Sequence, residues 1–331
     1  MSLGRSVGLT DTGRRRRRNE DSFVCEPPLF AIADGMGGAQ AGEVASRLAA
    51  AVLNETALVE DGELSEGRIA ELIQEANRRV FQRAREDAAA SGMGTTMTVA
   101  LVDGAAGTVA IGHVGDSRAY RVRDGELEQL TEDHSLVNEL LKSGKLFPEE
   151  AMSHPQRSVI TRAIGTEPDV DVDTFTVDAL PGDLFLLCSD GLTDMISDEE
   201  ILGLVRSGES DLDAAVRGLV EAANTSGGGD NITVVAFEIT EGEVDAGDTQ
   251  RLPAASTDAP TTDDEDTLSG LERVPAVDTA VLSAAEIREH GDEIAVEPAR
   301  QPEPHRRVLP LLLLFLLLAL IIVLVVWGLY R

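Results

Sequence analysis

Four apolar segments of this chain each lie beside an aspartate, and this pattern limits the possible folds more than any other feature of the sequence. The segments are LFAIADGMGG at 29–38, VAIGHVGDSRAY at 109–120, DLFLLCSDGLTD at 183–194 and GGGDNITVV at 227–235. A carboxylate at the end of a buried strand is costly unless it is paired or binds a cation. Each acid of this set therefore needs a partner. The set is Asp34, Asp116, Asp190 and Asp230, together with Glu20 and Asp21 just before a further strand at 22–25.

Taken singly, each Asp-Gly pair is also a common turn signal, because aspartate bonds locally and glycine accepts a positive φ. Taken together, the acids need cations, and lysine is scarce: residues 1–240 contain only Lys142 and Lys145. A ligand set of oxygens without histidine or cysteine suits hard cations such as Mg²⁺ or Mn²⁺. Two such ions that share a carboxylate can lower the pKa of a water and clamp a phosphoryl group.

Short apolar or alternating runs predict strands in residues 1–240, and apolar spacings of three and four residues predict helices between them. The predicted strands are 6–10, 22–25, 29–33, 95–102, 107–113, 118–123, 183–188 and 232–239. The predicted helices are 42–58, 66–90, 135–142, 198–205 and 212–224. Strands that follow one another directly, as they do between 95 and 123, favour antiparallel pairing over βαβ crossovers.

The net charge of −31 argues against a general nucleic-acid binder, whose surface would be basic. Much of this charge lies in residues 241–304, which hold 17 acidic residues, four arginines and no lysine. The segment has no sustained apolar period and cannot offset its ordering entropy by burial. We therefore predict one domain at 1–240 and an acidic, disordered linker at 241–304.

Residues 308–330 contain no charged side chain, and about 20 apolar residues span a bilayer core. The alternative, a buried core helix, would need further chain to cover it on all sides. We predict a single-pass membrane anchor at 305–331. His305, Arg306 and Arg307 precede the apolar run, which predicts that the domain lies on the cytoplasmic side of the inner membrane. No apolar signal-peptide core is present near the N-terminus.

Cysteine and histidine give weaker signals. Cys25 and Cys188 form no CxxC pair, so two buried free thiols are the simplest interpretation. His113 alternates with strand residues, as a core histidine would. None of the five histidines forms an HxH or HExxH pattern, which argues against a zinc site.

Six motifs, in order and spacing, resemble those of the metal-dependent protein phosphatases of type 2C. They are NED at 19–21, ADGMGG at 33–38, GMGTTMTVALV at 92–102, GHVGDSRAYRVRDGELEQLTEDHS at 112–135, LLCSDGLTD at 186–194 and DNITVV at 230–235. The resemblance covers about residues 4–240. It is nearest to membrane-anchored bacterial enzymes that work opposite transmembrane Ser/Thr kinases. It implies an α+β fold in which an antiparallel β-sandwich is flanked by helices on both faces, as four α-β-β-α layers.

The resemblance also implies roles by position. Asp34 would bridge two Mn²⁺ or Mg²⁺ ions, with the Gly35 carbonyl beside it. Asp190 and Asp230 would complete the ligands of the first ion, and Asp116 with Asp190 would hold a third, weaker ion. Glu20 and Asp21 match acids that bind metal directly or through water, and Asn231 would orient Asp230 or its waters.

The resemblance gives different roles to the arginines of the run RRRRRNED at 14–21. The phosphate-binding arginine of the family lies four residues before the glutamate, which makes it Arg16 here. Arg bound to phosphate donates as a bidentate fork. Arg14, Arg15, Arg17 and Arg18 then face solvent or favour acidic lipid, and the sequence leaves this open.

Two further positions bear on the chemistry. Many eukaryotic members carry a histidine, proposed as a general acid, where this chain has Met36, which has no proton to give. His134 is an alternative donor to which the family pattern gives no fixed role. Residues 136–168 match the family's mobile flap beside the site.

We therefore predict hydrolysis of phosphoserine and phosphothreonine in proteins, by in-line attack of a water that bridges two ions. The catalytic domain would act as a monomer on phosphoproteins, transmembrane kinases and their substrates among them, and not on nucleic acid. The alternatives are a phosphatase of a phosphorylated regulator such as an anti-sigma antagonist, and an inactive phosphoprotein-binding module. A structural membrane protein is a further alternative, which leaves the acids unexplained.

Overall fold

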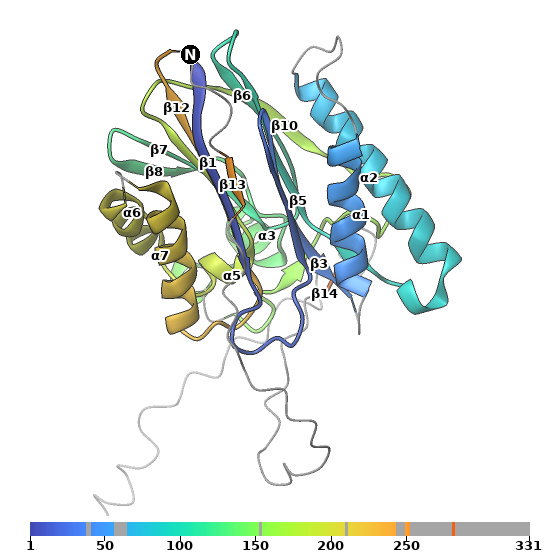
Figure 1. The fold of residues 1–331 in the computed structure, drawn as a ribbon. Helices are drawn as coiled ribbons and strands as arrows, with labels where there is room; N and C mark the ends of the chain where they lie inside the picture. The colour runs from blue at the N-terminus through green and yellow to red at the C-terminus, as the bar shows by residue number, and fades with distance from the viewer. Residues whose placement is uncertain are drawn as a thin grey trace, which may run out of the picture. The chain divides into compact units, whose positions relative to one another are not determined.

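Two antiparallel sheets pack face to face at the centre of the fold, and helices cover the outer face of each (Figure 1). This is a computed structural model that describes residues 1–37, 41–55, 65–151, 154–208, 211–242, 249–251 and 280–281. A first unit comprises Met1–Ala284, and the second, Ala285–Arg331, lies outside the described residues.

The first sheet has the strand order β13-β1-β12-β11-β7-β8 and the second β10-β6-β5-β3-β2, with β4 paired to β3. The strands of the first sheet are β1 (Ser2–Asp11), β7 (Arg118–Arg123), β8 (Glu126–Gln129), β11 (Leu184–Cys188), β12 (Ile232–Thr240) and β13 (Thr249–Arg251). Those of the second are β2 (Asp21–Glu26), β3 (Leu29–Met36), β4 (Gly94–Thr95), β5 (Met97–Asp103), β6 (Thr108–Val114) and β10 (Asp173–Asp178). A separate parallel pair joins β9 (Val159–Ile160) to β14 (Ala280–Val281).

Helices α1 (Ala41–Glu55) and α2 (Glu66–Glu86) cover the second sheet, and α6 (Asp198–Ser207) and α7 (Leu212–Thr225) cover the first (Figure 1). The shorter helices are η1 (Ala88–Ala90), α3 (Leu136–Lys142), α4 (Pro148–Ala151) and α5 (Asp190–Thr193). The apolar period predicted for α2 is confirmed, since Ile69, Leu72, Ile73, Ala76 and Val80 are all buried. Helix α6 begins with a capping box in which the side chains of Ser197 and Glu200 each bond the other's backbone N–H.

Three apolar cores separate the four layers. One lies between the second sheet and helices α1 and α2, and another between the first sheet and helices α6 and α7. The third lies between the two sheets, where Phe237 of β12 stacks on Phe30 of β3 with ring centroids 4.2 Å apart. Phe185 stacks on the same Phe237 ring at 5.1 Å. The predicted antiparallel α+β architecture is confirmed.

Several elements differ from the sequence prediction. The strand predicted at 95–102 is interrupted at Thr96, whose N–H turns away to donate to the Asp34 carbonyl. Strand β10 was not predicted, because it is an edge strand with no fully buried residue and therefore gives no apolar run. The helix predicted at 66–90 ends at Glu86 and is followed by the 3₁₀ turn η1.

Two short strands fall within the predicted linker. Strand β13 pairs in parallel with the edge strand β1, and β14 pairs in parallel with β9. The predicted membrane segment at 308–330 lies outside the described residues. Among the residues that are described, none belongs to a helix long and apolar enough to cross a bilayer.

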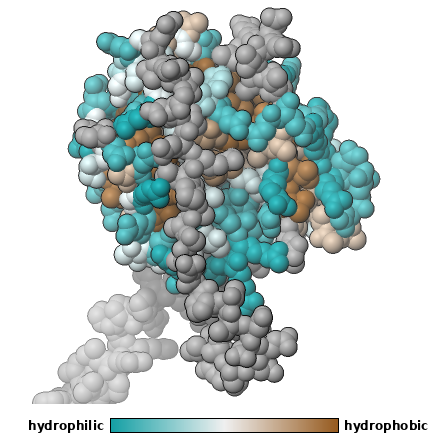
Figure 2. Space-filling model, in the orientation of Figure 1, coloured by the Kyte–Doolittle hydropathy of each residue, from teal (hydrophilic) through white to brown (hydrophobic). Residues whose placement is uncertain are grey.

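The drawn face of the molecule is mostly hydrophilic, with small separate hydrophobic spots (Figure 2). Over the described part of the chain, only Phe147 and Leu180 are large hydrophobic side chains with high exposure, at 68% and 50%. The apolar residues of the fold are therefore used almost entirely in the three cores.

The aromatic stack between the sheets gives a stability prediction. Replacement Phe237→Ala removes the shared ring of two stacked pairs, and we expect it to lower the free energy of unfolding by about 3–5 kcal/mol. Urea unfolding followed by circular dichroism measures this change. Phe147→Ala is the matched control and should be nearly neutral, because that ring lies in solvent. Equal effects of the two substitutions would contradict the proposed role of the stack.

Candidate metal centre

The predicted acids come together at one end of the two sheets, the lower end in Figure 1. The antiparallel register of β2 and β3 places Asp21 directly opposite Asp34. In the other sheet, Asp190 follows the end of β11 and Asp230 precedes the start of its antiparallel partner β12. Asp116 follows the end of β6, which runs in the same direction as β3 because both pair antiparallel to β5. Strand direction alone therefore gathers these side chains.

Hydroxyl groups of the first sheet hold a carboxylate of the second. Ser189 Oγ and Thr233 Oγ1 donate to Asp21 Oδ2 over 2.9 and 2.5 Å. Asp21 thus accepts two bonds from the first sheet, and it ties the two sheets together at this end. Sequence reasoning identified Asp21 but missed both hydroxyl partners. Ser189 directly precedes Asp190, and Thr233 lies two residues after Asn231.

Asp34 is fixed through its backbone. Its N–H donates to Thr96 Oγ1 over 2.9 Å, and its carbonyl accepts from Thr96 N and Thr95 Oγ1, both at 2.8 Å. Thr96 Oγ1 also shares a 2.8 Å bond with Ser117 Oγ, next to Asp116. The TT pair at 95–96 and Ser117 therefore position two of the predicted ligands, although sequence analysis gave them no role.

Gly35 has space for no side chain. A Cβ atom there would lie 2.2 Å from the Gly42 carbonyl oxygen and 2.5 Å from that of Glu20. Only glycine lets strand β3 approach the segment that carries Glu20 so closely. This explains why an Asp-Gly pair stands here as part of the site and not as a turn.

Burial and mutual repulsion raise the pKa values of the grouped acids. Burial raises the pKa of Asp34 well above its usual range, and Asp21, Asp190 and Asp230 raise it further. Asp190 shifts the same way, through burial first and then through Asp116 and Asp230. The pKa of Asp21 is raised to about 6 and that of Asp116 to about 7, with burial the largest cause in both. The site thus has more negative charge than its own residues can neutralise.

Several carboxylate oxygens in this group have no protein partner. Oδ1 of Asp21, of Asp116 and of Asp190 is buried and accepts no hydrogen bond in the structure. Buried acceptors without donors are rare and call for an explanation. Oxygen-only acceptors in a field of excess negative charge fit hard divalent cations, so the residues present suit the predicted metals.

The carboxylates are not yet arranged around a single point. Over the described residues, no group of three or more His, Cys, Asp or Glu side chains could hold an ion as it stands. Both oxygens of Asp230 are engaged, Oδ2 by Arg16 Nη2 at 2.6 Å and Oδ1 by the N–H of Asn231 at 2.8 Å. Arg16 occupies the position of a cation beside Asp230, and an ion bound there would have to displace it.

Arg16 differs from the other four arginines of its run. Arg14, Arg15, Arg17 and Arg18 are exposed, whereas Arg16 is half-buried. Burial alone would lower the pKa of Arg16, but Asp230, Asp190 and Asp34 together raise it. The guanidinium of Arg16, the arginine that the spacing to Glu20 selects, donates to Asp230.

Asn231 holds the loop that carries Arg16. Its Nδ2 donates to the carbonyl oxygens of Thr12 and Arg18 over 3.0 and 2.9 Å, and its Oδ1 accepts from Glu20 N over 2.8 Å. The amide is thereby fully used by the backbone of the arginine loop. The side chain of Asn231 thus bonds the loop backbone, and its N–H bonds Asp230.

Asp194 is a third acid beside Asp116 and Asp190, and sequence reasoning missed it. It lies four residues after Asp190, one turn along α5, and raises the pKa values of both Asp116 and Asp190. The motif DGLTD carried this signal, since residues four apart share a helix face. All three acids line a cavity of about 410 Å³, with flap residues Arg157 and Ser158 on another wall.

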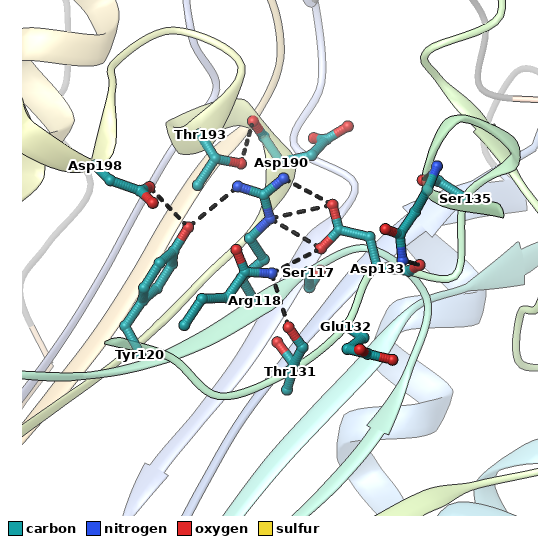
Figure 3. A network of polar contacts seen from close by, with 12 residues as sticks. Ser117, Arg118, Tyr120, Thr131, Glu132, Asp133, Ser135, Asp190, Thr193 and Asp198 are labelled. Carbon is teal, nitrogen blue, oxygen red and sulfur yellow. Dashed lines mark hydrogen bonds and ion pairs between the residues drawn. The ribbon is translucent and has the colours of Figure 1, made fainter. Parts of the chain in front are cut away.

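A polar network supports this cavity (Figure 3). Arg118 Nε and Nη2 donate to the two oxygens of Asp133 over 2.9 and 2.7 Å. Arg118 Nη1 donates to Tyr120 Oη, which in turn donates to Asp198, both over 3.1 Å. The network anchors β7 directly after Asp116 and Ser117, so the loop that carries Asp116 is held from both sides.

Neither ring nitrogen of His134 is free. Nδ1 accepts from the N–H of Gly115 over 3.0 Å, and Nε2 lies 3.0 Å from Arg162 Nη1 and 3.1 Å from Asp173 Oδ2. Burial lowers the pKa of His134, and the nearby Arg162 lowers it further. His134 therefore holds the backbone of Gly115, directly after β6, and its ring is not directed at the acids of the candidate site.

The sequence and the fold both have close counterparts among known proteins. A family model described as Protein phosphatase 2C matches residues 14–227. Serine/threonine phosphatase stp of Listeria monocytogenes is 42% identical over 238 residues, which are 69% of this chain and 93% of that protein. Serine/threonine protein phosphatase PstP of Mycobacterium tuberculosis is 40% identical over 255 residues, 76% of this chain and 48% of that protein.

Solved structures show the same fold. The crystal structure of the Mycobacterium tuberculosis phosphatase PstP/Ppp has a TM-score of 0.69 and 39% identity, covering 72% of this chain and 100% of that one. A structure of the PstP catalytic domain in complex with two manganese ions has a TM-score of 0.65 and 37% identity, covering 72% of this chain and 99% of that one.

The raised pKa values give a prediction for stability in the absence of metal. The unfolded chain releases the protons of Asp21 and Asp116 near pH 4, whereas the folded protein keeps them until about pH 6–7. The free energy of unfolding should therefore fall as pH rises from about 4 to about 7. Mn²⁺ binds only the folded site, so it should raise the melting temperature most at the upper end of that range.

Thermal unfolding at pH 5.5 and 7.5, with chelator or with Mn²⁺, measures these effects. Asp116→Asn is the matched variant: without metal it should melt higher than wild type at pH 7.5, and it should gain less from Mn²⁺. If the metal-free melting temperature is the same at both pH values, the pKa values of these carboxylates are not raised by folding.

Proposed function

Because this chain belongs to the protein phosphatase 2C family of metal-dependent serine/threonine phosphatases, we propose that it dephosphorylates proteins at the cytoplasmic face of the membrane, transmembrane Ser/Thr kinases among them. The phosphatase activity itself follows from the family and from the identity to phosphatases over more than two thirds of the chain. Its natural substrates and its place in the cell are the proposed part.

One observation carries the assignment of the site: a half-buried arginine bonds Asp230 beside buried acids that each have one oxygen without a partner. Asp34, Asp190 and Asp230, with the Gly35 carbonyl, would hold the first ions, and Glu20 and Asp21 would bind directly or through water. We extend the proposal to a third ion at Asp116 and Asp190, where Asp194 adds a further carboxylate. Divalent ions at these positions supply positive charge for phosphoryl oxygens and lower the pKa of a water.

Arg16 binds the phosphoryl group in this proposal. Its guanidinium donates to Asp230, and an arginine fork can donate to two oxygens of a phosphoryl group. Were Asp230 to hold a metal ion, Arg16 would pass from that carboxylate to the phosphoryl group and would still be paired with an anion. Asn231 keeps the loop backbone in place while the side chain of Arg16 changes partner.

Neither cysteine of the domain is available as a nucleophile at this site. Cys25 and Cys188 are both buried, and burial raises the pKa of Cys188 to about 12, so it stays a thiol. Met36 has no proton to donate, and the ring of His134 is committed to Gly115 and Asp173. Water therefore serves as the nucleophile, and the proton for the leaving group comes from solvent in the site.

The contrast between two neighbouring arginines tests the phosphate site. Arg16→Ala should lower kcat/KM for a phosphothreonine peptide about tenfold or more, since a hydrogen bond to a charged group contributes about 1.5–3 kcal/mol. The loss should appear mainly in KM. Arg14→Ala, an exposed arginine of the same run, should stay close to wild type. Equal losses of kcat/KM in the two variants would show that Arg16 does not bind the phosphoryl group specifically and that the arginine run acts only through its overall charge.

The proposed setting rests on the uncharged run at 308–330 and the strongly acidic linker before it. A membrane anchor would raise the effective concentration of the domain near membrane kinases. Phosphoproteomics of a deletion strain, complemented with wild type or with Asp34→Ala, tests the substrates. We expect activation-loop sites of membrane kinases to gain phosphate in the deletion and with Asp34→Ala. If only soluble regulators, such as an anti-sigma antagonist, gain phosphate, these regulators and not the kinases are the natural substrates.

A further inference from the structure

A segment from far along the linker occupies the outer edge of flap strand β9. Ala280 pairs with Val159 and Val281 pairs with Ile160, in parallel. The other edge of β9 belongs to the domain, since Ile160 bridges Ser135 and the N–H of Thr161 donates to the His134 carbonyl over 2.9 Å. Strand β9 is therefore held from both sides, by the domain and by the linker.

Strand β9 also packs against the strand that carries Asp34. The side chain of Ile160 forms a buried cluster with Ala163 and with Met36, which lies two residues after Asp34. Further along the flap, Ile164 exchanges two backbone hydrogen bonds with Thr95, at 3.1 and 2.8 Å. Thr95 Oγ1 in turn donates to the carbonyl of Asp34. A restraint on β9 therefore acts on a segment in direct contact with the strand that carries Asp34.

The same segment forms a wall of the cavity beside the acids. Arg157 and Ser158, directly before β9, line the cavity together with Asp116 and Asp190. A protein substrate is larger than this cavity of about 410 Å³, so its approach requires room at the flap. Strand pairing at β9 holds that wall in place.

We propose that the outer edge of β9 is the binding surface for the linker strand around Ala280–Val281, and that this contact limits the access of protein substrates to the metal centre. Extended segments commonly bind by adding a strand to an exposed edge, where unpaired N–H and C=O groups are available. Two residue pairs form a weak contact, but the linker makes it intramolecular, with an effective concentration of about the millimolar range. Such a contact is reversible, so whatever binds the linker releases the flap.

Proline substitution in the full-length protein tests this pairing, because proline lacks the N–H that a strand partner needs. The variant is Ala280→Pro/Val281→Pro. The matched control is Ala254→Pro/Ala255→Pro, two prolines in the same linker at positions outside both described linker strands. Hydrogen exchange of the backbone amides at 158–162 reports the contact, and kinetics with a phosphothreonine protein and with a small aryl phosphate report access.

In the variant, exchange at 158–162 and kcat/KM for the phosphoprotein should each rise at least about fivefold, the lower range of coupling between two sites. Activity on the aryl phosphate, which is small enough to pass the flap, should be unchanged, as should all values in the control. Unchanged exchange would show that the pairing does not form in solution. Faster exchange with unchanged phosphoprotein kinetics would show that the pairing does not limit access. Neither result depends on which protein is the natural substrate.

Discussion

Negative charge gathered at one end of a two-sheet sandwich is the constraint on which the other features of this structure depend. The two sheets contribute acids from separate parts of the sequence, and Asp21 joins them by accepting hydrogen bonds from Ser189 and Thr233. These hydroxyls satisfy one oxygen of Asp21 and leave the other without a donor. The protein therefore fixes the positions of its carboxylates without neutralising them. Buried carboxylate oxygens that have no donor favour the binding of cations.

The same end of the sandwich controls the arginine loop. Asn231 bonds the loop at Thr12, Arg18 and Glu20, and the carbonyl of Gly228 accepts from the N–H groups of Arg14 and Arg15 over 2.8 and 3.2 Å. With the backbone held at both ends, Arg16 is half-buried and bonds Asp230, whereas the other four arginines of the run are exposed. Asp230 and Asn231 thus both hold the arginine loop, Asp230 through the guanidinium of Arg16 and Asn231 through the loop backbone.

Sequence patterns predicted the sheet type, the main helices and the acids, because these depend on apolar periodicity and on carboxylates beside buried strands. What the patterns could not provide were the partners that hold the acids. Thr95, Thr96, Ser117, Ser189 and Thr233 are common strand or turn residues, and only three-dimensional proximity shows their role. Asp194 was within reach, since its spacing from Asp190 is one helical turn. The edge strand β10 has no fully buried residue, and the two-residue strand β14 is too short to give a pattern in the sequence.

Met36 connects the chemistry of the centre to the flap. Where many eukaryotic relatives place a histidine, this chain places a flexible apolar side chain that packs against Ile160 and Ala163 of the flap. A histidine at this position would bring a polar ring into a buried apolar cluster, at the cost of desolvation. The methionine gives up a proton donor and gains a contact between the Asp34 strand and the flap. Met36 thus joins the strand that carries Asp34 to the flap through apolar packing.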